Sequence, residues 1–387
     1  MPPGGGGPSV GAMSNASRLK SDEEVIQLVL DHIDGGSTDT TDDVWREPVA
    51  NYLDPARYEA ELALLRRYPI PFCPSLVLDK PGVFLAREAA GVPLLAVRGQ
   101  DGVARVFKNA CRHRGMQVAE GCGHAGGFMC PYHGWSYGLD GGLVNVPHAE
   151  GFPDLDKATR GLVPVHAVEH AGLVFVTQEP GQFGDDVLAA IPEMVPPDEH
   201  LHLHDVAEVE ANWKVLMEGF LEGYHIKPTH KESFFPHGFD NLNIVERFGR
   251  NNRVVFPFRA IEKFRDPART RSADRVLSYN NHLFPNAMVI TFPDMLVSLV
   301  LEPIAIDRTR VHSWAMNGRA LKNAENPRAT EGAMQFLDAG VLEDRAMARS
   351  IQRSLGSGAN EFFEFGKFEG ALTHFHRSLG AALGRLD

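Results

Sequence analysis

The sequence predicts a mixed fold of two domains, a β-rich domain followed by one that combines strands with helices. A chain of 387 residues is longer than most single hydrophobic cores, so two cores are expected. Strand-like runs between turn residues, such as PLLAVRG, ARVFKN and GLVFVTQ, occupy residues 45–180. Apolar residues at helical spacing recur further along the chain. We therefore predict an N-terminal arm at 1–44, a β-rich domain at 45–180 and a second domain at 185–387.

The composition excludes two classes of protein. Charged residues make up 23% of the chain, and no uncharged apolar run has the length of about 18 residues that a transmembrane helix needs. The formal net charge of −12 argues against a protein that binds nucleic-acid phosphates through Lys and Arg. We expect neither a membrane nor a nucleic acid as partner.

The arm begins with a segment rich in Gly, Pro and Ser that lacks the apolar core of a secretory signal. We expect this segment to be disordered, the protein to be cytoplasmic, and DEEVIQLVLDHI at 22–33 to form a short helix. Four cysteines in so long a chain do not make a disulfide framework. In a reducing compartment, Cys near His more often indicates a metal site.

Potential metal ligands cluster in the β-rich domain, at residues 109–135. Cys111 and His113 form a Cys-x-His pair, Cys130 and His133 form a Cys-x-x-His pair, and sixteen residues separate the two pairs. Each pair can hold a metal from one tight loop, and the surrounding glycines suit tight turns.

Three interpretations of this cluster compete. GCGHAG at 121–126 has the spacing of a dinucleotide-binding loop, but no apolar strand precedes it and no helical pattern follows. A zinc site is compatible with the residue types, although the order Cys, His, Cys, His departs from that of zinc fingers. A Rieske 2Fe-2S cluster, with two thiolates on one iron and two imidazoles on the other, fits best.

The segments CRHRG and CPYHGWSYGLDG closely resemble the Rieske motif of ring-hydroxylating oxygenases. By this resemblance the chain is similar to the alpha, or terminal oxygenase, subunit of Rieske non-heme iron oxygenases. The resemblance implies that Cys111 and Cys130 hold one iron of the cluster and that His113 and His133 hold the other.

The segment ANWKVLMEGFLEGYHIKPTHKESFFP at 211–236 predicts an amphipathic helix. Asn212 is a plausible N-cap, and Pro228 is expected to end the helix because it disfavours helical geometry at Lys227. The apolar residues expected to pack on a core are Trp213, Leu216, Met217, Phe220 and Tyr224.

A second metal site is expected where this helix ends. Glu222 and His225 are three residues apart, so they share a helix face on which a carboxylate can orient an imidazole. The turn after Pro228 brings His230 toward the same point. The segment resembles the family's mononuclear-iron motif, (Asp/Glu)-x-Tyr-His-x(4)-His, which implies iron ligation by His225 and His230. Two histidines and one carboxylate form the facial triad of non-heme Fe(II) oxygenases.

The third ligand is expected from a distant segment, the helical stretch at 334–355. The family places a carboxylate on a late helix, and EDRAMARSIQR resembles that region. We predict Asp344 as the ligand, with Glu343 and Asp338 as alternatives.

The resemblance covers nearly the whole chain past the arm. It implies an α+β fold in which an all-β Rieske domain precedes a helix-grip (START-like) catalytic domain built on an antiparallel sheet. It implies a head-to-tail homotrimer in which Glu222, as a catalytic bridge, connects His133 of one subunit to His225 of the next. Neither a flavin nor an NAD motif is present, so electrons are expected from an NAD(P)H-dependent reductase or a ferredoxin.

The implied reaction is the oxygenation of a small organic substrate. Members of the family perform cis-dihydroxylation, monohydroxylation and oxidative demethylation. The short chain favours an alpha-only enzyme that hydroxylates or demethylates an aromatic substrate, as in aromatic hydrocarbon catabolism. An aromatic-ring dihydroxylating enzyme and a non-catalytic Rieske electron carrier remain as alternatives. Residues expected to line an apolar pocket are Phe220, Phe234, Phe235, Phe256, Phe284, Met288, Phe292 and Met295.

Overall fold

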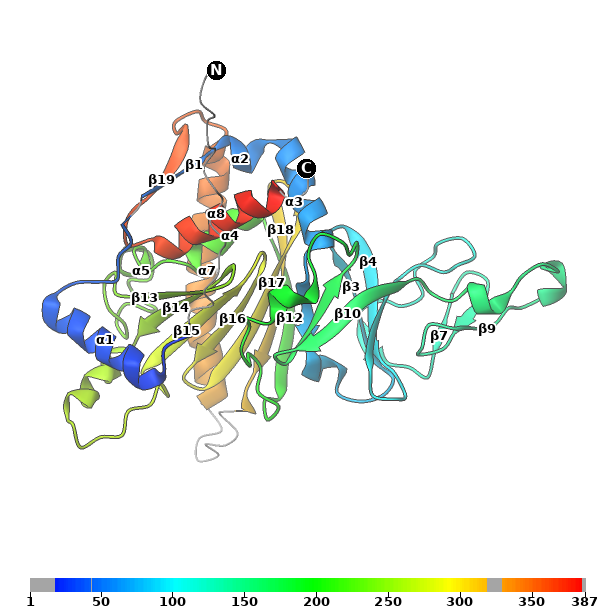
Figure 1. Ribbon diagram of the computed structural model, residues 1–387, viewed down its shortest axis with the longest axis horizontal. Helices are drawn as coiled ribbons and strands as arrows, with labels where there is room; N and C mark the ends of the chain where they lie inside the picture. Colours follow the sequence, from blue (N-terminus) through cyan, green and yellow to red (C-terminus); the bar gives the residue numbers. More distant parts are fainter. Residues whose placement is uncertain (1–17, 43, 319–328, 385–387) are drawn as a thin grey trace, which may run out of the picture.

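Two seven-stranded antiparallel sheets form the frame of the molecule (Figure 1). The computed structural model describes residues 18–42, 44–318 and 329–384. Within these residues, the first sheet has the order β2-β11-β10-β5-β4-β3-β6 and the second the order β12-β18-β17-β16-β15-β14-β13. The predicted α+β class, with a β-rich domain followed by an antiparallel-sheet domain, is confirmed.

The first sheet holds the predicted strand runs and carries a smaller sheet at its far end. Strand β3 alternates buried and half-buried residues, as expected for a sheet with one face on a core. A three-stranded sheet, β7-β8-β9, extends the domain outward. The strands of both sheets are β2 (Ile70–Pro74), β3 (Val83–Ala89), β4 (Val92–Arg98), β5 (Ala104–Lys108), β6 (Cys122–His124), β7 (Phe128–Met129), β8 (Ser136–Tyr137), β9 (Leu143–Asn145), β10 (Pro164–His170) and β11 (Leu173–Thr177).

The second sheet supports the C-terminal helices. All but the last two residues of its longest strand are buried, because α4 packs on that strand and α7 packs on α4. Helix α8 packs on β13 and β14. This arrangement is the predicted helix-grip pattern. The elements are β12 (Leu201–Val209), α4 (Trp213–Gly219), α5 (Ile226–Thr229), β13 (Ile244–Phe248), β14 (Asn251–Pro257), β15 (Leu277–Leu283), β16 (Ala287–Phe292), β17 (Met295–Ala305), β18 (Arg308–Met316), α7 (Ala329–Leu355) and α8 (Gly370–Leu383).

The N-terminal segment packs on the C-terminal half of the chain. Helix α1 (Asp22–Gly35) confirms the helix predicted at 22–33 and begins with a capping box, in which Ser21 N–H donates to Glu24 at 2.7 Å. Strand β1 (Trp45–Pro48) pairs with β19 (Phe362–Phe365), and α2 (Ala50–Leu53) and α3 (Pro55–Arg67) follow it. The predicted domain limits stay a prediction. Strand β1 and helix α3 pack on the C-terminal half of the chain, while Arg66 at the end of α3 also bonds to residues of the first domain.

A buried ion pair joins α3 to α4. Lys214 Nζ lies 2.7 Å from a carboxylate oxygen of Glu61, and both side chains are only 1% exposed. The indole N–H of Trp213 donates to the same carboxylate at 2.9 Å. These bonds satisfy the buried carboxylate from two sides, as a charge in an apolar core requires.

The helix predicted at 211–236 is shorter than expected. Asn212 caps α4 by accepting from Lys214 N–H, as predicted, but the helix ends at Gly219 and the chain continues in turns. Pro228 does not end a helix; it lies in the first turn of α5, where a backbone N–H needs no partner. Because the helix ends early, Tyr224 is 57% exposed instead of packing on the core.

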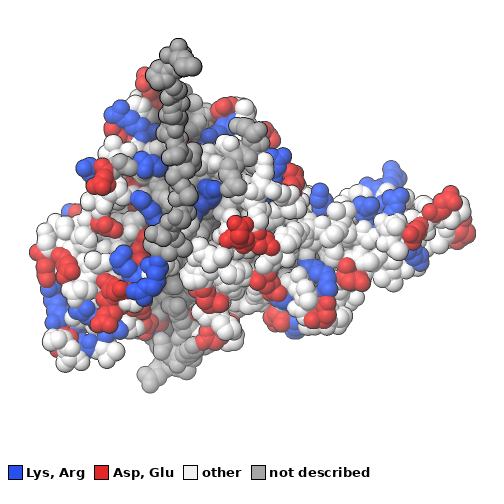
Figure 2. Space-filling model, in the orientation of Figure 1, with Lys and Arg blue, Asp and Glu red and all other residues white. Residues whose placement is uncertain are grey.

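Charges of both signs are interspersed over the face of the molecule shown in Figure 2. No helix among the described residues is both long enough and apolar enough to cross a membrane.

Candidate metal centres

The first candidate centre is built on two tight loops of the first domain. Cys111 N–H donates to the carbonyl of Met116 at 2.7 Å, and Cys130 N–H donates to the carbonyl of Trp135 at 2.8 Å. Each loop contains a glycine with positive φ, at 82° for Gly115 and 74° for Gly134. A residue with a Cβ rarely adopts this conformation, which explains a glycine two residues after His113 and one residue after His133.

The four predicted cluster ligands lie at the tips of these two loops. Cys111 and Cys130 are 4% and 2% exposed, and the Nδ1 atoms of His113 and His133 lie 3.1 Å apart. Burial raises the pKa of the Cys130 thiol, while the backbone amides of Tyr132 and His133 oppose this shift. Backbone amides that face a sulfur also stabilise a thiolate bound to iron.

Aromatic side chains support this centre from within. The Trp135 indole stacks on the His113 ring at 5.0 Å between centroids, with 9° between the planes. The Tyr137 hydroxyl accepts from Arg112 N–H at 2.8 Å and lies 3.2 Å from Cys111 Sγ. Both rings are buried, so they fix the ligand loops and are not available to a substrate.

The four loop ligands do not converge on one point. Among the described residues, the only group of three or more potential ligands whose atoms lie within 4.8 Å of one another is elsewhere in the chain. A single tetrahedral zinc requires such convergence, whereas a two-iron cluster is held by one pair at each end. The arrangement therefore fits the 2Fe-2S cluster and not zinc.

The group that does converge is His225, His230 and Asp344. Asp344 Oδ1 lies 3.0 Å from His230 Nε2 and 3.7 Å from His225 Nε2. This oxygen is buried and has no hydrogen-bond partner among the described residues. A buried carboxylate oxygen that accepts no hydrogen bond and faces two imidazole nitrogens is costly unless a cation lies between them, so these residues fit a mononuclear metal.

The other nitrogen of each imidazole is held by a carboxylate. His225 Nδ1 is hydrogen-bonded to Glu222 Oε1, and His230 Nδ1 lies 2.8 Å from Glu343 Oε2. These bonds place a proton on each Nδ1 and leave each Nε2 lone pair facing Asp344. Burial lowers the pKa of His225, but the carboxylates of Glu222, Asp344 and Glu369 together raise it, and the net shift is upward.

The structure separates the three candidates for the third ligand. Glu343 lies on the Nδ1 side of His230, where Ser233 Oγ also donates to it at 2.5 Å, so it orients the imidazole from outside. Asp338 is exposed on α7, and Asp344 alone faces both Nε2 atoms. Glu222 and His225 lie in a turn, not on the predicted helix face, and still meet because the turn closes over three residues.

Sequence reasoning missed one acidic neighbour of this centre. Burial, together with the nearby carboxylates of Glu222 and Glu218, raises the pKa of Glu369 to about 7. Glu369 lies just before α8, far along the chain from the motif, and no spacing in the sequence points to it.

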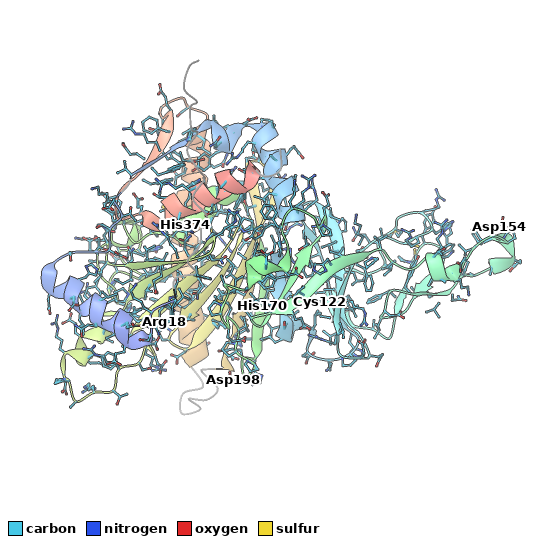
Figure 3. All side chains as sticks on the ribbon, viewed as in Figure 1. Arg18, Cys122, Asp154, His170, Asp198 and His374 are labelled. Carbon is cyan, nitrogen blue, oxygen red and sulfur yellow. The ribbon has the colours of Figure 1, made fainter. Side chains whose placement is uncertain are left out.

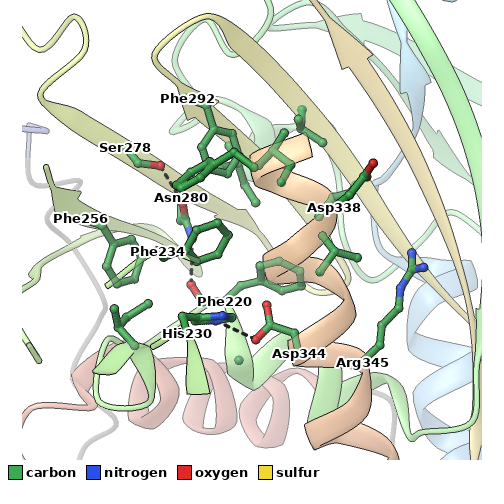
Figure 4. A pocket seen from close by; sticks show the side chains of 18 of the residues that line it. Phe220, His230, Phe234, Phe256, Ser278, Asn280, Phe292, Asp338, Asp344 and Arg345 are labelled. Carbon is green, nitrogen blue, oxygen red and sulfur yellow. Dashed lines mark hydrogen bonds and ion pairs between the residues drawn. The ribbon is translucent and has the colours of Figure 1, made fainter. Parts of the chain in front are cut away.

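A cavity of about 530 Å³ opens beside the three converging residues, between α7 and the second sheet. Four of the predicted lining residues, Phe220, Phe234, Phe256 and Phe292, do line it (Figure 4). The other four do not: Phe284, Met288 and Met295 are buried in the core, and Phe235 lies outside the lining. The spacing of apolar residues in a sequence does not distinguish a cavity wall from a core.

Two protein-family models match the chain. The model described as the Rieske 2Fe-2S domain matches residues 69–163, and the model described as the ring hydroxylating alpha subunit (catalytic domain) matches residues 197–385. The first contains the loop ligands and the second contains His225, His230 and Asp344.

The chain belongs to the Rieske ring-hydroxylating oxygenase family.

Several curated Rieske oxygenases are similar to the chain. The carnitine monooxygenase oxygenase subunit of Escherichia coli (strain K12) is 33% identical over 217 residues, which are 53% of this chain and 56% of that protein. The glycine betaine monooxygenase oxygenase subunit of Chromohalobacter salexigens is 36% identical over 39% of this chain and 35% of that protein. The chain thus spans about half the length of the carnitine monooxygenase subunit and about a third of the glycine betaine monooxygenase subunit.

Solved Rieske oxygenases share the fold. A quaternary ammonium Rieske monooxygenase in complex with L-carnitine gives a TM-score of 0.75 at 23% identity, covering 87% of this chain and 95% of that chain. Naphthalene 1,2-dioxygenase from Rhodococcus sp. gives 0.69 at 18% identity, covering 93% and 97%. A Rieske domain and a catalytic domain of this family carry a 2Fe-2S cluster and a mononuclear iron.

Proposed function

We propose that this chain is the terminal oxygenase of a Rieske system, which uses O2 and electrons from a separate reductase or ferredoxin to oxygenate a small organic substrate. The observation that carries the proposal is the convergence of His225, His230 and Asp344 on one point in the wall of an apolar cavity. An electron carrier needs no such site. Iron bound there would activate O2 next to a substrate in the cavity.

In the proposed enzyme, each metal ligand has a defined role and the neighbouring carboxylates hold the iron-binding imidazoles in place. In this proposal Cys111, Cys130, His113 and His133 hold the cluster, while Glu222 and Glu343 fix the imidazoles of His225 and His230. The phenyl rings of the cavity exclude water from the reacting carbon. The reaction is thus confined to a molecule that fills the cavity.

We propose that electrons pass between subunits of a head-to-tail homotrimer. The cluster loops extend from one end of the molecule, near Asp154, whereas α8, which carries His374, lies in the other half (Figures 1 and 3). The ring of His133 is exposed and available to a second copy. A contact from His133 of one subunit to Glu222 of the next would connect the cluster of the first subunit to the iron site of the second through one carboxylate. Inter-subunit electron transfer has been described for a solved quaternary ammonium Rieske monooxygenase, 21% identical over 95% of this chain.

The substrate is proposed to be a quaternary ammonium compound that is monooxygenated and loses a methyl group. Named relatives act on carnitine and glycine betaine, and phenyl rings attract a methylated ammonium group through their faces. The second candidate is an aromatic substrate, because the same rings suit aromatic stacking and a chlorobenzene dioxygenase alpha subunit is 34% identical over 39% of this chain. We also propose that the enzyme is cytoplasmic.

Substrate-stimulated O2 consumption tests the proposal. Purified protein with a generic reductase and NADH is screened against N-methyl compounds, aromatic acids and phenyl ethers, and products are identified by mass spectrometry. We expect O2 uptake that depends on one class of substrate and a product with one inserted oxygen or one lost methyl group. Reduction of the cluster without any substrate-dependent uptake by the metal-replete protein would instead support an electron carrier.

A further inference from the structure

An arginine without a partner lines the substrate cavity. Arg345 follows Asp344 on α7, and both side chains contribute to the same cavity wall. Its side chain is half-buried, and the described part of the chain offers its guanidinium neither a hydrogen bond nor an ion pair. A guanidinium has five N–H donors and cannot lose its charge in a protein, so partial burial without a partner is costly.

The charged groups around Arg345 do not replace a partner. Asp205 on β12 and Asp338 on α7 act on the guanidinium as negative charges, and Arg349 acts as a positive one. Both carboxylates are exposed, so water and salt screen them. Figure 4 shows Asp344 directed toward His230, whereas Arg345 runs along the side of α7 that carries Asp338.

Most of the remaining lining of the cavity is apolar or aromatic, and the exposed Asp205 and Asp338 also line it. An uncharged occupant would displace water from the guanidinium and give it no hydrogen-bond acceptor in return. A carboxylate matches the planar fork of an arginine through two parallel hydrogen bonds.

We propose that the substrate carries a carboxylate that Arg345 binds, at the end of the molecule opposite the carbon that is oxidised. This inference rests on the proposed function, because it takes the cavity to be the substrate site. It narrows the substrate class to organic acids, including betaines, whose apolar or methylated end lies among the phenyl rings.

Binding of matched acid and amide pairs tests this inference. Isothermal titration of the metal-loaded protein compares hydrocinnamate with hydrocinnamamide, and γ-butyrobetaine with its primary amide. In the wild type we expect the acid of at least one pair to bind about tenfold more tightly than its amide, since a charge-assisted hydrogen bond has about that effect.

Variants of Arg345 assign the preference to this residue. Arg345→Gln is expected to remove the preference for the acid and to leave the affinity for the amide within about twofold, while Arg345→Lys keeps part of the preference. Asp338→Asn, on the same side of α7, is the matched control and is expected to keep the preference. Circular dichroism and iron content verify that each variant is folded and loaded.

Three results would overturn the inference. The first is that the wild type binds the acids no more tightly than the amides, and the second is that the preference for the acid persists in Arg345→Gln. The third is that the wild type binds the amides more tightly and that this difference disappears in Asp338→Asn, which would show a cation site. Failure of the proposed function has a different signature, namely loaded wild-type protein without substrate-stimulated O2 uptake. The ratio of affinities does not depend on turnover.

Discussion

Asp344 Oδ1 lies 3.0 Å from His230 Nε2, although the two residues belong to distant parts of the chain. The oxygen is buried without a hydrogen-bond partner among the described residues, and His225 Nε2 faces it from the other side at 3.7 Å. Two imidazoles and one carboxylate thus present their lone pairs to one point beside an apolar cavity. This relationship distinguishes an oxygenase from a Rieske electron carrier.

Replacing Asp344 is expected to empty this site selectively. Asp344→Ala removes the anionic ligand and should reduce iron from about three to about two per chain, because the two cluster irons are held by the other domain. Iron and sulfide assays, with EPR of the reduced protein, measure this change. Glu343→Gln is the matched control and is expected to retain more iron than Asp344→Ala, since it only orients His230. Equal loss in both variants would contradict the assignment of Asp344.

Glu222→Gln tests the proposed bridge between subunits. The amide keeps the shape of the carboxylate but not its charge, so we expect cluster and iron to remain loaded and substrate turnover to fall about 100-fold or more. The reduction rate of the cluster by the reductase should not change. The control is Glu232→Gln, a nearby exposed carboxylate. Normal turnover by Glu222→Gln would eliminate the bridge.

The buried pair between α3 and α4 is expected to dominate the stability of this region. Lys214→Met leaves the 1% exposed Glu61 with Arg57 as its remaining ion-pair partner, whose Nε lies 3.1 Å from Glu61 Oε1. The loss in the free energy of unfolding should therefore be about 3 kcal/mol, at the lower end for a broken buried pair. The control, Lys227→Met, breaks a pair with Asp240 whose side chains are 54% and 47% exposed, and should cost no more than about 1 kcal/mol. Urea unfolding followed by circular dichroism compares the two, and similar losses would contradict the importance of burial.

Stability is expected to fall in mild acid, in part because of His282. Burial lowers the pKa of this fully buried imidazole to about 4, whereas an imidazole in the unfolded chain titrates near 6.5. Between these values the unfolded state binds the proton and the folded state does not, so the stabilisation is complete above about pH 6.5 and is lost toward pH 4.

A variant without this imidazole should be less sensitive to acid. Between about pH 7 and pH 5, His282→Gln is expected to lose about 2 kcal/mol less unfolding free energy than the wild type. Urea titrations at the two pH values measure the difference. The exposed His200 supplies the control, since His200→Gln should keep the wild-type slope. An unchanged slope in His282→Gln would show that this histidine does not contribute.

The sequence brought to notice those proposed ligands that lie close together in the chain. Cys111, His113, Cys130 and His133 occupy two short loops, and His225 and His230 one further segment, so spacing alone brought them to notice. Asp344 required the family resemblance, because helical periodicity does not distinguish it from Glu343. Only the structure shows which of these two carboxylates faces both Nε2 atoms.

Features that depend on tertiary packing could not be predicted. The spacing of apolar residues predicted a helix that continues past Gly219, where α4 ends. The turns that follow expose Tyr224, which a continuous helix would have buried. Nothing local to Glu369 or Arg345 shows that the fold brings these side chains to the iron site and the cavity.

The stoichiometry of iron and sulfide in the purified protein tests the central claim most directly, together with the EPR spectrum after reduction. The account predicts about three irons and two sulfides per chain, with a Rieske-type signal from the reduced cluster. Two irons and two sulfides, after anaerobic reconstitution with Fe(II), would show that His225, His230 and Asp344 hold no metal and would contradict the claim that this chain is an oxygenase.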